Sequence, residues 1–221
     1  MKKILVLTVL ITVFFSCYDG PPPPKRVLLD VPYFPWLAHG YCAIACIQMW
    51  ALYDGIAVTQ NEIEAYTGTY PNPFEVANAI SIFTGSYGWI EYEDAILIDQ
   101  AQDLCISYSV ACIEDRCPSI MPFERGDHSV ITIGYKWTQT SAGFPLAEYM
   151  DYHDPNPNEG GGLRLPGNVL KTLFLPTEQG YYFVIVGFGF HVNVGRIGYA
   201  AFLDAGGTYL GGPSIYYPQG Y

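Results

Sequence analysis

Apolar side chains follow a helical period in the first half of the chain. Within residues 41–53 they recur every three or four positions, which places them on one face of a helix. Asp54-Gly55 comes directly after this run and is a typical end of a helix. The sequence therefore predicts a helix over 41–53. Its apolar face consists of Cys42, Ala45, Cys46, Met49 and Tyr53.

Three more helices are predicted before the middle of the chain. Thr59-x-x-Glu62 is a capping-box pattern, and it opens a helix through residue 66. Asn72-Pro73 combines an N-cap residue with proline at the first helical position, and it opens a helix through residue 83. The range 93–104 is predicted as the fourth helix.

After Cys117 the pattern changes to short aromatic and β-branched runs, separated by Gly, Pro and Asn clusters, which are typical of strands. Helices followed by strands indicate an α+β fold rather than an alternating α/β fold. The glycine-rich part from Gly160 onward is interpreted either as an extra hairpin layer or as a lid on the substrate side. The predicted strands are a short one over 27–34, and then 119–123, 128–137, 148–152, 181–188 and 199–203.

The N-terminus has the pattern of a targeting segment. Residues 4–15 carry no charge and follow Lys2 and Lys3. This run is shorter than the roughly 20 residues that span a bilayer as a helix, but it fits the core of a signal peptide. Ser16-Cys17 resembles a lipobox, so we expect residues 1–16 to be removed and Cys17 to be lipidated. Ordinary secretion and a retained N-terminal anchor helix are the alternatives.

Residues 17–26 are interpreted as a tether between the lipidated cysteine and the folded domain. Pro21 to Pro24 favour an extended polyproline II spacer. We therefore expect an exported protein, anchored in the membrane by its lipid alone, or otherwise periplasmic or secreted.

Composition favours one folded domain and argues against nucleic acid as a partner. Half of the residues are hydrophobic and only 14% are charged, so the chain can build a core. The net charge is −11, and it becomes −13 when Lys2 and Lys3 leave with the signal peptide. Binding to nucleic acid depends on clustered cations, which this acidic chain lacks.

Six cysteines are present. With Cys17 lipidated and Cys42 a working thiol, four remain for structural roles. Cys105, Cys112 and Cys117 are close in sequence, and an exported protein can keep disulfides, so one bridge among these three is expected. The spacing does not select the pair.

Three residues carry the candidate chemistry. Cys42 lies at or near the start of the predicted helix 41–53, where unpaired N–H groups and a partial positive charge favour a thiolate. His128 opens a strand after a turn, and a cysteine nucleophile needs such a base. Asp154 ends the next strand, where it can orient the imidazole. Cys46 lies one turn deeper on the same helix face, so we expect it in the core.

The residues around these three resemble a known family. The segment Gly40 to Gly55, which contains Cys42-Ala43-Ile44-Ala45-Cys46, is similar to the nucleophile helix of the bacteriocin-processing, double-glycine peptidases and their stand-alone relatives. Gly126 to Tyr135 resembles their histidine strand, and Asp154-Pro155 resembles their acid. The resemblance covers about Val27 to Pro157. It implies a papain-like fold, in which an N-terminal helical part with the nucleophile helix packs on an antiparallel sheet.

The resemblance also predicts how the chain is divided. Residues 27–157 are expected to form the peptidase core. Residues 158–221 are expected to be Gly-rich and aromatic strands that complete or extend the sheet.

One feature of the family is missing. The family places a glutamine shortly before the cysteine, where its side chain helps to hold the oxyanion. This chain has Pro35-Trp36 there, and no glutamine occurs between Val27 and Cys42. An oxyanion donor typically contributes about 10²–10³ in rate. The indole N–H of Trp36 is the candidate replacement, and an imidazole N–H of His39 is the other.

The three residues and the resemblance together imply a thiol peptidase, in which Cys42 attacks, His128 transfers the proton and Asp154 orients the imidazole. We expect it to act on peptides or proteins at the bacterial cell surface or in the periplasm, without a cofactor. The alternative is a catalytically impaired papain-like lipoprotein that binds peptides without cleaving them. A metal site is disfavoured, because the chain has no HExxH or paired CxxC motif.

Overall fold

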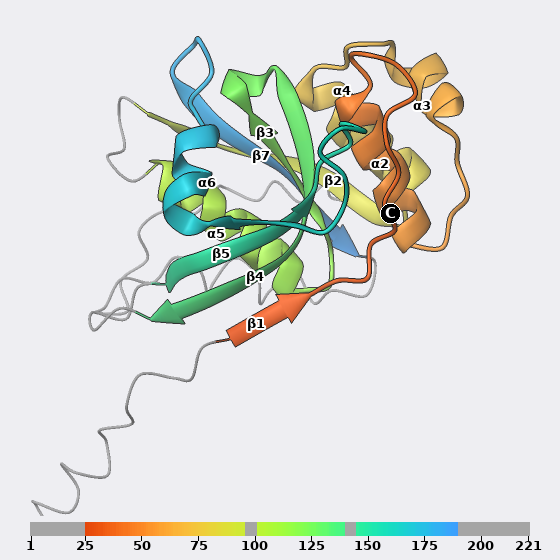
Figure 1. Ribbon diagram of the computed structural model, residues 1–221. Helices are drawn as coiled ribbons and strands as arrows, with labels where there is room; N and C mark the ends of the chain where they lie inside the picture. The colour runs from red at the N-terminus through yellow and green to blue at the C-terminus, as the bar shows by residue number, and fades with distance from the viewer. Residues whose placement is uncertain (1–24, 96–100, 140–144, 190–221) are drawn as a thin grey trace, which may run out of the picture.

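The computed structural model describes residues 25–95, 101–139 and 145–189 (Figure 1). Four helices of the N-terminal and middle parts are α2, α3, α4 and α5, and a short α6 follows later. Their bounds are Cys42–Tyr53 (α2), Gln60–Thr67 (α3), Pro73–Phe83 (α4), Ala101–Glu114 (α5) and Gly167–Leu173 (α6). The strands are Lys25–Leu28 (β1), Ser86–Asp94 (β2), Ser119–Phe123 (β3), His128–Gln139 (β4), Pro145–His153 (β5), Leu163–Pro166 (β6) and Tyr181–Gly189 (β7), and a 3₁₀ turn, η1, covers Glu124–Gly126.

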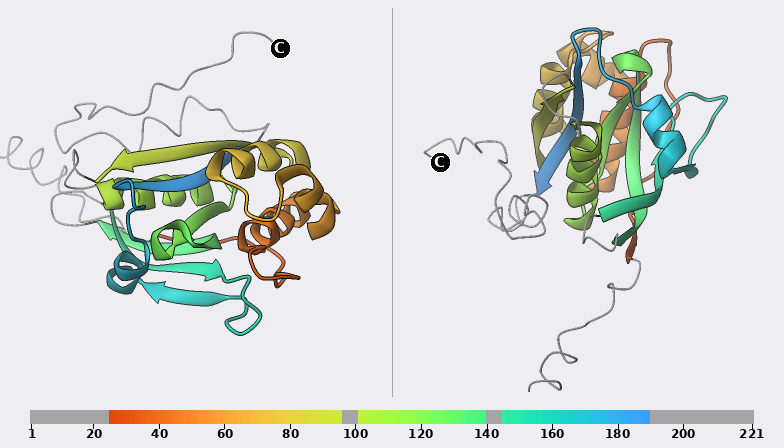
Figure 2. Two further views of the ribbon diagram at one scale, coloured as in Figure 1. Left: turned by 90° about the horizontal axis from the view of Figure 1, so that it is seen from above. Right: turned by 90° about the vertical axis from the view of Figure 1, so that its left-hand side faces the viewer.

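The seven strands form one sheet in which every pairing is antiparallel. The order is β2-β7-β3-β4-β5-β6, and β1 pairs with β4. Figure 2 shows α2, α3 and α4 grouped at one end of this sheet. The fold is therefore the α+β arrangement expected from the sequence, with a helical N-terminal part packed on an antiparallel sheet.

The helix α2 is apolar on nearly all sides because other elements surround it. Its buried residues include Ile44 and Ile47 as well as Ala45, Cys46 and Met49 of the predicted face, and it packs against β4, α4 and α3. A helix that is hydrophobic all round belongs in the interior. This burial fixes the position of its first residue, Cys42, relative to the sheet.

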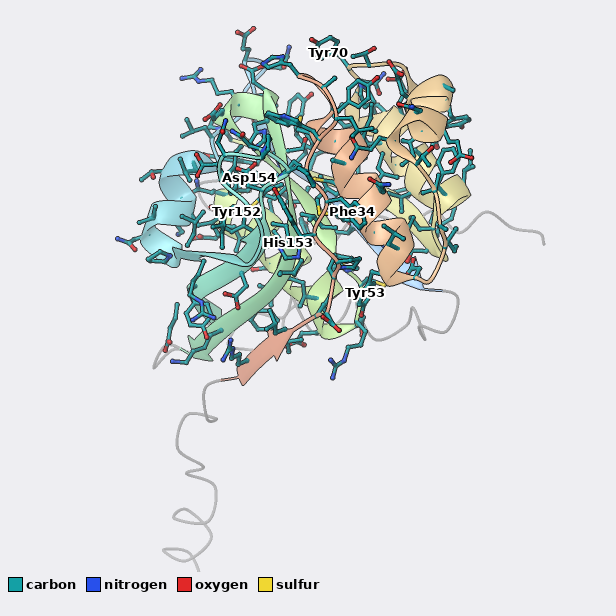
Figure 3. The ribbon with its side chains drawn as sticks, turned by 45° about the vertical axis from the view of Figure 1, so that its right-hand side comes forward. Phe34, Tyr53, Tyr70, Tyr152, His153 and Asp154 are labelled. Carbon is teal, nitrogen blue, oxygen red and sulfur yellow. The ribbon has the colours of Figure 1, made fainter. Side chains whose placement is uncertain are left out.

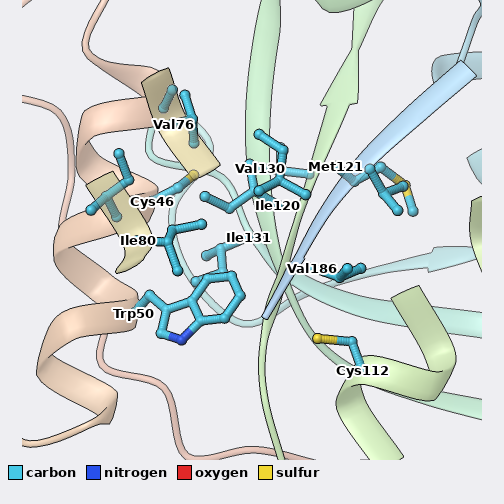
Figure 4. Close-up of a cluster of buried hydrophobic side chains, with 14 of the residues drawn as sticks. Cys46, Trp50, Val76, Ile80, Cys112, Ile120, Met121, Val130, Ile131 and Val186 are labelled. Atoms are coloured by element: carbon cyan, nitrogen blue, oxygen red, sulfur yellow. The ribbon is translucent and has the colours of Figure 1, made fainter. Parts of the chain in front are cut away.

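The central strands are covered on both faces. All five residues of β3 are buried, as are Val184, Ile185 and Val186 of β7. Figure 4 shows Trp50 and Cys46 of α2 on one side of these strands and Cys112 of α5 on the other. The core thus consists of two layers that meet at β3 and β7.

An extended connection, residues 29–41, joins β1 to α2 and is called the connecting segment below. Leu29 donates a backbone hydrogen bond to Ile133 in β4 at 2.7 Å. Figure 3 labels Phe34 on this segment, together with Tyr152, His153 and Asp154 at the end of β5. The segment therefore runs along the part of the sheet that carries the candidate acid.

The predictions for α2, α3, α4 and the strands 119–123, 128–137, 148–152 and 181–188 are confirmed, with ends shifted by a few residues. The predicted helix 93–104 is wrong at its start, whereas its last four residues belong to α5. β2 extends through Asp94, and α5 begins at Ala101 and continues through Glu114. β2 forms because all nine of its residues pair with β7, which lies far away in the sequence. No local pattern reports such a partner.

The N-terminal strand also differs from the prediction over 27–34. β1 begins at Lys25 and ends at Leu28, and the residues that follow are extended without strand pairing. The predicted targeting segment, the lipidated Cys17, most of the tether and the predicted strand 199–203 lie outside the described residues.

The part from residue 158 onward is neither a separate layer nor a lid where the structure describes it. β6 pairs with β5, and β7 lies inside the sheet between β2 and β3. α6 was not predicted. Residues 158–189 therefore belong to the same domain as the expected peptidase core.

Gly187 in β7 allows close packing between the sheet and α2. A Cβ at this position would lie 2.2 Å from the Trp50 ring, well inside contact distance. Trp50 is fully buried, and its indole N–H donates to Ser86 Oγ at 3.3 Å, so the ring has little room to move.

We predict that Gly187→Ala lowers the free energy of unfolding by about 1–3 kcal/mol, because the added methyl group overpacks the core. Urea denaturation measures this. Gly85→Ala is the matched control, since a Cβ there would meet Asp54 at an ordinary 3.6 Å. Equal destabilisation by both variants would contradict the packing argument.

Candidate active site

Cys42 is the first residue of α2 and is partly exposed. No side chain among the described residues caps this helix. Gly40 shapes the turn before it, with a φ of +91° that favours glycine, and the Tyr70 ring occupies the space where a Cβ would lie. The N-terminus of a buried helix therefore presents Cys42 and its backbone N–H to the outside.

His128 is placed by a tight hairpin. It is the first residue of β4 and pairs with Phe123, the last residue of β3. The turn between them has positive φ angles at Glu124, Arg125 and Gly126. Two non-glycine residues in this conformation are uncommon, and the turn they form sets where β4 begins.

Asp154 directly follows β5, which runs antiparallel to β4. Because Ile131 pairs with His153, the end of β5 lies beside the start of β4. His128 Nε2 lies 2.9 Å from Asp154 Oδ1. The same oxygen accepts a hydrogen bond from the backbone N–H of Asn156 at 2.8 Å, which fixes the carboxylate.

The thiol of Cys42 also interacts with the His128 ring, whose Nε2 is engaged by Asp154. Burial by itself raises the pKa of Cys42. The hydrogen bond to His128, its charge and the backbone N–H groups of Ser129 and Ala43 outweigh this, so the pKa of Cys42 is lowered. This favours a thiolate.

The His128 ring shows the complementary shift. Burial lowers its pKa, but the hydrogen bonds and negative charges of Asp154 and Cys42 raise the pKa to about 9. A lowered thiol pKa beside a raised imidazole pKa describes a thiolate–imidazolium pair. The sequence predicted these three residues separately, and the structure brings them together.

Cys46 is fully buried, as expected from its place on the helix face, and its Sγ lies 3.6 Å from the backbone oxygen of Ser129. Burial and the nearby Cys42 and Asp154 raise its pKa well above the ordinary value. It therefore stays a thiol, one turn away from Cys42.

The cysteines of the middle part are also buried. Cys105, Cys112 and Cys117 are not joined by a disulfide, so the bridge expected among them is not formed in this structure. A hydrogen bond joins the side chains of Cys112 and Cys117 instead. Burial raises the pKa values of Cys105 and Cys112, and Cys117 is buried too, so Cys42 is the thiol best suited to reaction among the described cysteines.

Trp36 lies against the candidate histidine. Its ring meets the His128 ring edge to face, with 5.8 Å between centroids and an interplanar angle of 84°. Its backbone N–H donates to the oxygen of Pro155 at 2.8 Å. His39 is exposed, and its ring centroid lies 6.1 Å from that of Trp36. Of the two oxyanion candidates, Trp36 is thus the one in contact with His128.

His153 is a residue that the sequence analysis missed. It is buried next to Asp154, its Nε2–H donates to the oxygen of Val31 at 2.8 Å, and its Nδ1 accepts from the N–H of Gly162 at 2.7 Å. These partners define a neutral ring, and burial lowers its pKa. The side chain links the connecting segment to the loop after Asp154. Nothing in the sequence around His153 indicated this role.

The described residues contain no cluster of three or more His, Cys, Asp or Glu side chains able to hold a metal ion. Within residues 25–95, 101–139 and 145–189, every helix falls short of the length and apolar character that a membrane span requires.

The fold and the site define a papain-like cysteine peptidase scaffold, in which a nucleophile helix packs on an antiparallel sheet that carries histidine and acid. The model of the Peptidase_C39 like family matches residues 28–188. The chain therefore belongs to this family. The match extends past residue 157, where the resemblance in the sequence ended, and includes β6 and nearly all of β7.

Several solved structures are similar to this chain. A double glycine motif protease from an AMS/PCAT transporter, solved with its leader peptide, has 17% identity and a TM-score of 0.48, covering 76% of this chain and 98% of its own. A protein from Bacillus anthracis described as a C39-like peptidase has 13% identity and a TM-score of 0.48, with coverages of 74% and 98%. The peptidase domain of Streptococcus ComA has 11% identity and a TM-score of 0.45, with coverages of 70% and 98%. No curated protein matches the chain.

We predict that iodoacetamide at about pH 6 alkylates Cys42 well ahead of Cys46 in the native protein. An ordinary thiol with a pKa of about 8.5 is almost fully protonated there, whereas His128 keeps part of Cys42 as thiolate. Mass spectrometry of the digested protein measures the labelling of each site.

His128→Ala is the control for this experiment. Loss of the imidazolium should move the labelling of Cys42 to higher pH. Labelling of Cys46 first, or an unchanged pH profile in the variant, would contradict the ion pair.

Proposed function

We propose that this chain is a thiol peptidase that hydrolyses peptide bonds, with Cys42 as nucleophile, His128 as acid and base, and Asp154 as the group that orients His128. The observation that carries the proposal is the 2.9 Å contact between His128 and Asp154, together with the interaction of the Cys42 thiol with the same ring. Membership of the Peptidase_C39 like family supports the same reaction class.

In the first half-reaction, the Cys42 thiolate attacks the carbonyl carbon of the scissile bond. A C–S bond forms, and the C=O electron pair moves to the oxygen. The backbone N–H of Cys42, at the start of α2, can stabilise this oxyanion. The C–N bond then breaks as the His128 imidazolium gives its proton to the leaving amine, which leaves a thioester on Cys42.

In the second half-reaction, neutral His128 takes a proton from water while the water oxygen attacks the thioester carbon. The C–S bond breaks, the acid product leaves, and the thiolate–imidazolium pair returns. Asp154 keeps its hydrogen bond to Nε2 in both halves, so the ring presents the same nitrogen to Cys42 throughout.

A peptide-binding protein without cleavage is the second candidate. Pro35-Trp36 at the position of the family glutamine favours it, because a weak oxyanion site slows acylation more than binding. The Cys42, His128 and Asp154 arrangement favours the peptidase, since binding alone needs none of the three.

We predict that Asp154→Asn lowers kcat for a peptide substrate by up to about 10⁴-fold, and that Cys42→Ala and His128→Ala lower it further and abolish detectable turnover. Asparagine keeps an oxygen for His128 Nε2–H but loses the charge that raises the pKa of the ring. The alkaline limb of the pH–rate profile, near pH 9 in the wild type, should therefore move to lower pH in Asp154→Asn.

Steady-state kinetics between acidic and alkaline pH test this prediction. Loss in Asp154→Asn as complete as in Cys42→Ala, with the fold intact, would contradict the assigned roles. A wild-type protein that binds peptides but neither cleaves them nor reacts with a thiol-directed peptidyl warhead would favour the binding protein.

We also propose that the enzyme is an exported bacterial lipoprotein that acts at the cell surface or in the periplasm. Ser16-Cys17 after an uncharged run supports this location. We predict a diacylglyceryl mass on Cys17 at the mature N-terminus, to be measured by mass spectrometry of protein from a bacterial membrane fraction. An unmodified N-terminus at another residue would contradict the anchor, and Cys17→Ser provides the control.

A further inference from the structure

The residues around Trp36 have no secondary structure and are held by contacts from two sides. On one side, the backbone N–H of Trp36 bonds to Pro155, directly after Asp154. On the other side, both neighbours of Trp36 bond to a single side chain of α3. That side chain is Gln60, the first residue of the helix.

The Gln60 carboxamide forms two hydrogen bonds with the backbone on either side of Trp36, one as acceptor and one as donor, as a neighbouring strand would. Its Oε1 accepts from the N–H of Leu37 at 2.9 Å, and its Nε2 donates to the oxygen of Pro35 at 2.8 Å. These two contacts bracket Trp36. They also define the orientation of the amide, because the reversed amide would place donor against donor and acceptor against acceptor.

Gln60 is itself fixed in place. Only 2% of its surface is exposed, and Nε2 also donates to Oε1 of Gln48 on α2 at 3.0 Å. Gln48 Nε2 in turn donates to the oxygen of Val58 at 2.9 Å. A buried and satisfied network of this kind holds one geometry, since any alternative would leave buried polar groups unpaired.

We propose that Gln60 is a positioning residue for the peptidase reaction. From its place on α3, Gln60 holds Pro35-Trp36-Leu37 against the Cys42–His128 pair and thereby positions the groups of this segment that face the oxyanion. The inference rests on the proposed thiol-peptidase function. It applies whether the indole N–H of Trp36 or a backbone group of this segment meets the oxyanion.

The role requires an amide. A methionine at position 60 has similar length but neither donates nor accepts, so Pro35 and Leu37 lose their partner. A glutamate accepts from Leu37 but donates to Pro35 only when its carboxyl group is protonated. Gln60→Met therefore removes the hydrogen bonds to Pro35 and Leu37, whereas Gln60→Glu keeps the bond to Leu37 and restores the bond to Pro35 when the carboxyl group is protonated.

We expect Gln60→Met to lower kcat by about 10- to 100-fold, since a small displacement of the oxyanion side weakens transition-state binding. KM and the rate of Cys42 alkylation by iodoacetamide should stay within about twofold, because neither depends on oxyanion stabilisation. A peptide aldehyde of the substrate sequence should bind more weakly by about the factor lost in kcat. Its adduct forms a C–S bond to Cys42 and places the former carbonyl oxygen, protonated by His128, on the oxyanion side.

Gln102→Met is the matched control. Gln102 lies on α5, and its Nε2 also donates to two backbone oxygens, of Lys171 at 2.8 Å and Phe174 at 2.7 Å. The variant loses comparable hydrogen bonds near α6, and we expect its kcat to equal that of the wild type. If Gln60→Met does not fold, Gln60→Glu serves in its place, because it preserves the size of the side chain. Its kcat relative to that of the wild type should rise as the pH falls from about 7 to about 5, since the carboxyl group becomes protonated.

Three results would overturn the inference. Unchanged kcat in Gln60→Met and Gln60→Glu would show that the hydrogen bonds of Gln60 to Pro35 and Leu37 have no role in turnover. A parallel fall in kcat and in Cys42 alkylation would place the effect on the thiol or on the fold. A wild type that alkylates at Cys42 without any turnover would remove the proposed function and this inference with it, whereas an active wild type with insensitive Gln60 variants removes the inference alone.

Discussion

The candidate site depends on the burial of α2 against β4. Because α2 is apolar on nearly all sides and enclosed by β4, α4 and α3, its position and tilt are set by the core. Cys42 stands where this helix leaves the interior, and His128 stands where β4 begins. The distance between thiol and imidazole is therefore a consequence of core packing. Close contacts in the core, such as that of Trp50 with Gly187, therefore contribute to the geometry of the site although they are not part of it.

The electrostatics of the site follow from partial burial. Burial alone would keep Cys42 a neutral thiol and His128 a neutral ring, because both charged forms are favoured by water. Each charge becomes favourable through the other, and the fixed carboxylate of Asp154 stabilises the imidazolium. Cys46 shows the contrast: one turn deeper, without a cationic partner, the same chemical group has a raised pKa. Placement at the helix start and beside His128 decides between these outcomes.

The sequence alone predicted the parts of this site that depend on local pattern. Helical spacing located α2, capping motifs located α3 and α4, and aromatic and β-branched runs between Gly, Pro and Asn clusters located β4 and β5. Cys42, His128 and Asp154 followed from their places at the ends of these elements. The failures were non-local. β2 was missed because its partner β7 is distant in the sequence. β7 was predicted as a strand, but it was placed outside the expected core because the family resemblance ended at Pro157.

The polar residues that hold the connecting segment were not predictable by such rules. Gln60 and His153 had no predicted role, because their partners at Pro35, Leu37 and Val31 are backbone groups without a sequence signature. A segment without regular strand or helix pairing satisfies part of its buried backbone through such side chains. Side chains from α3 and from the end of β5 therefore determine the geometry beside Cys42, where the chain lacks the family glutamine.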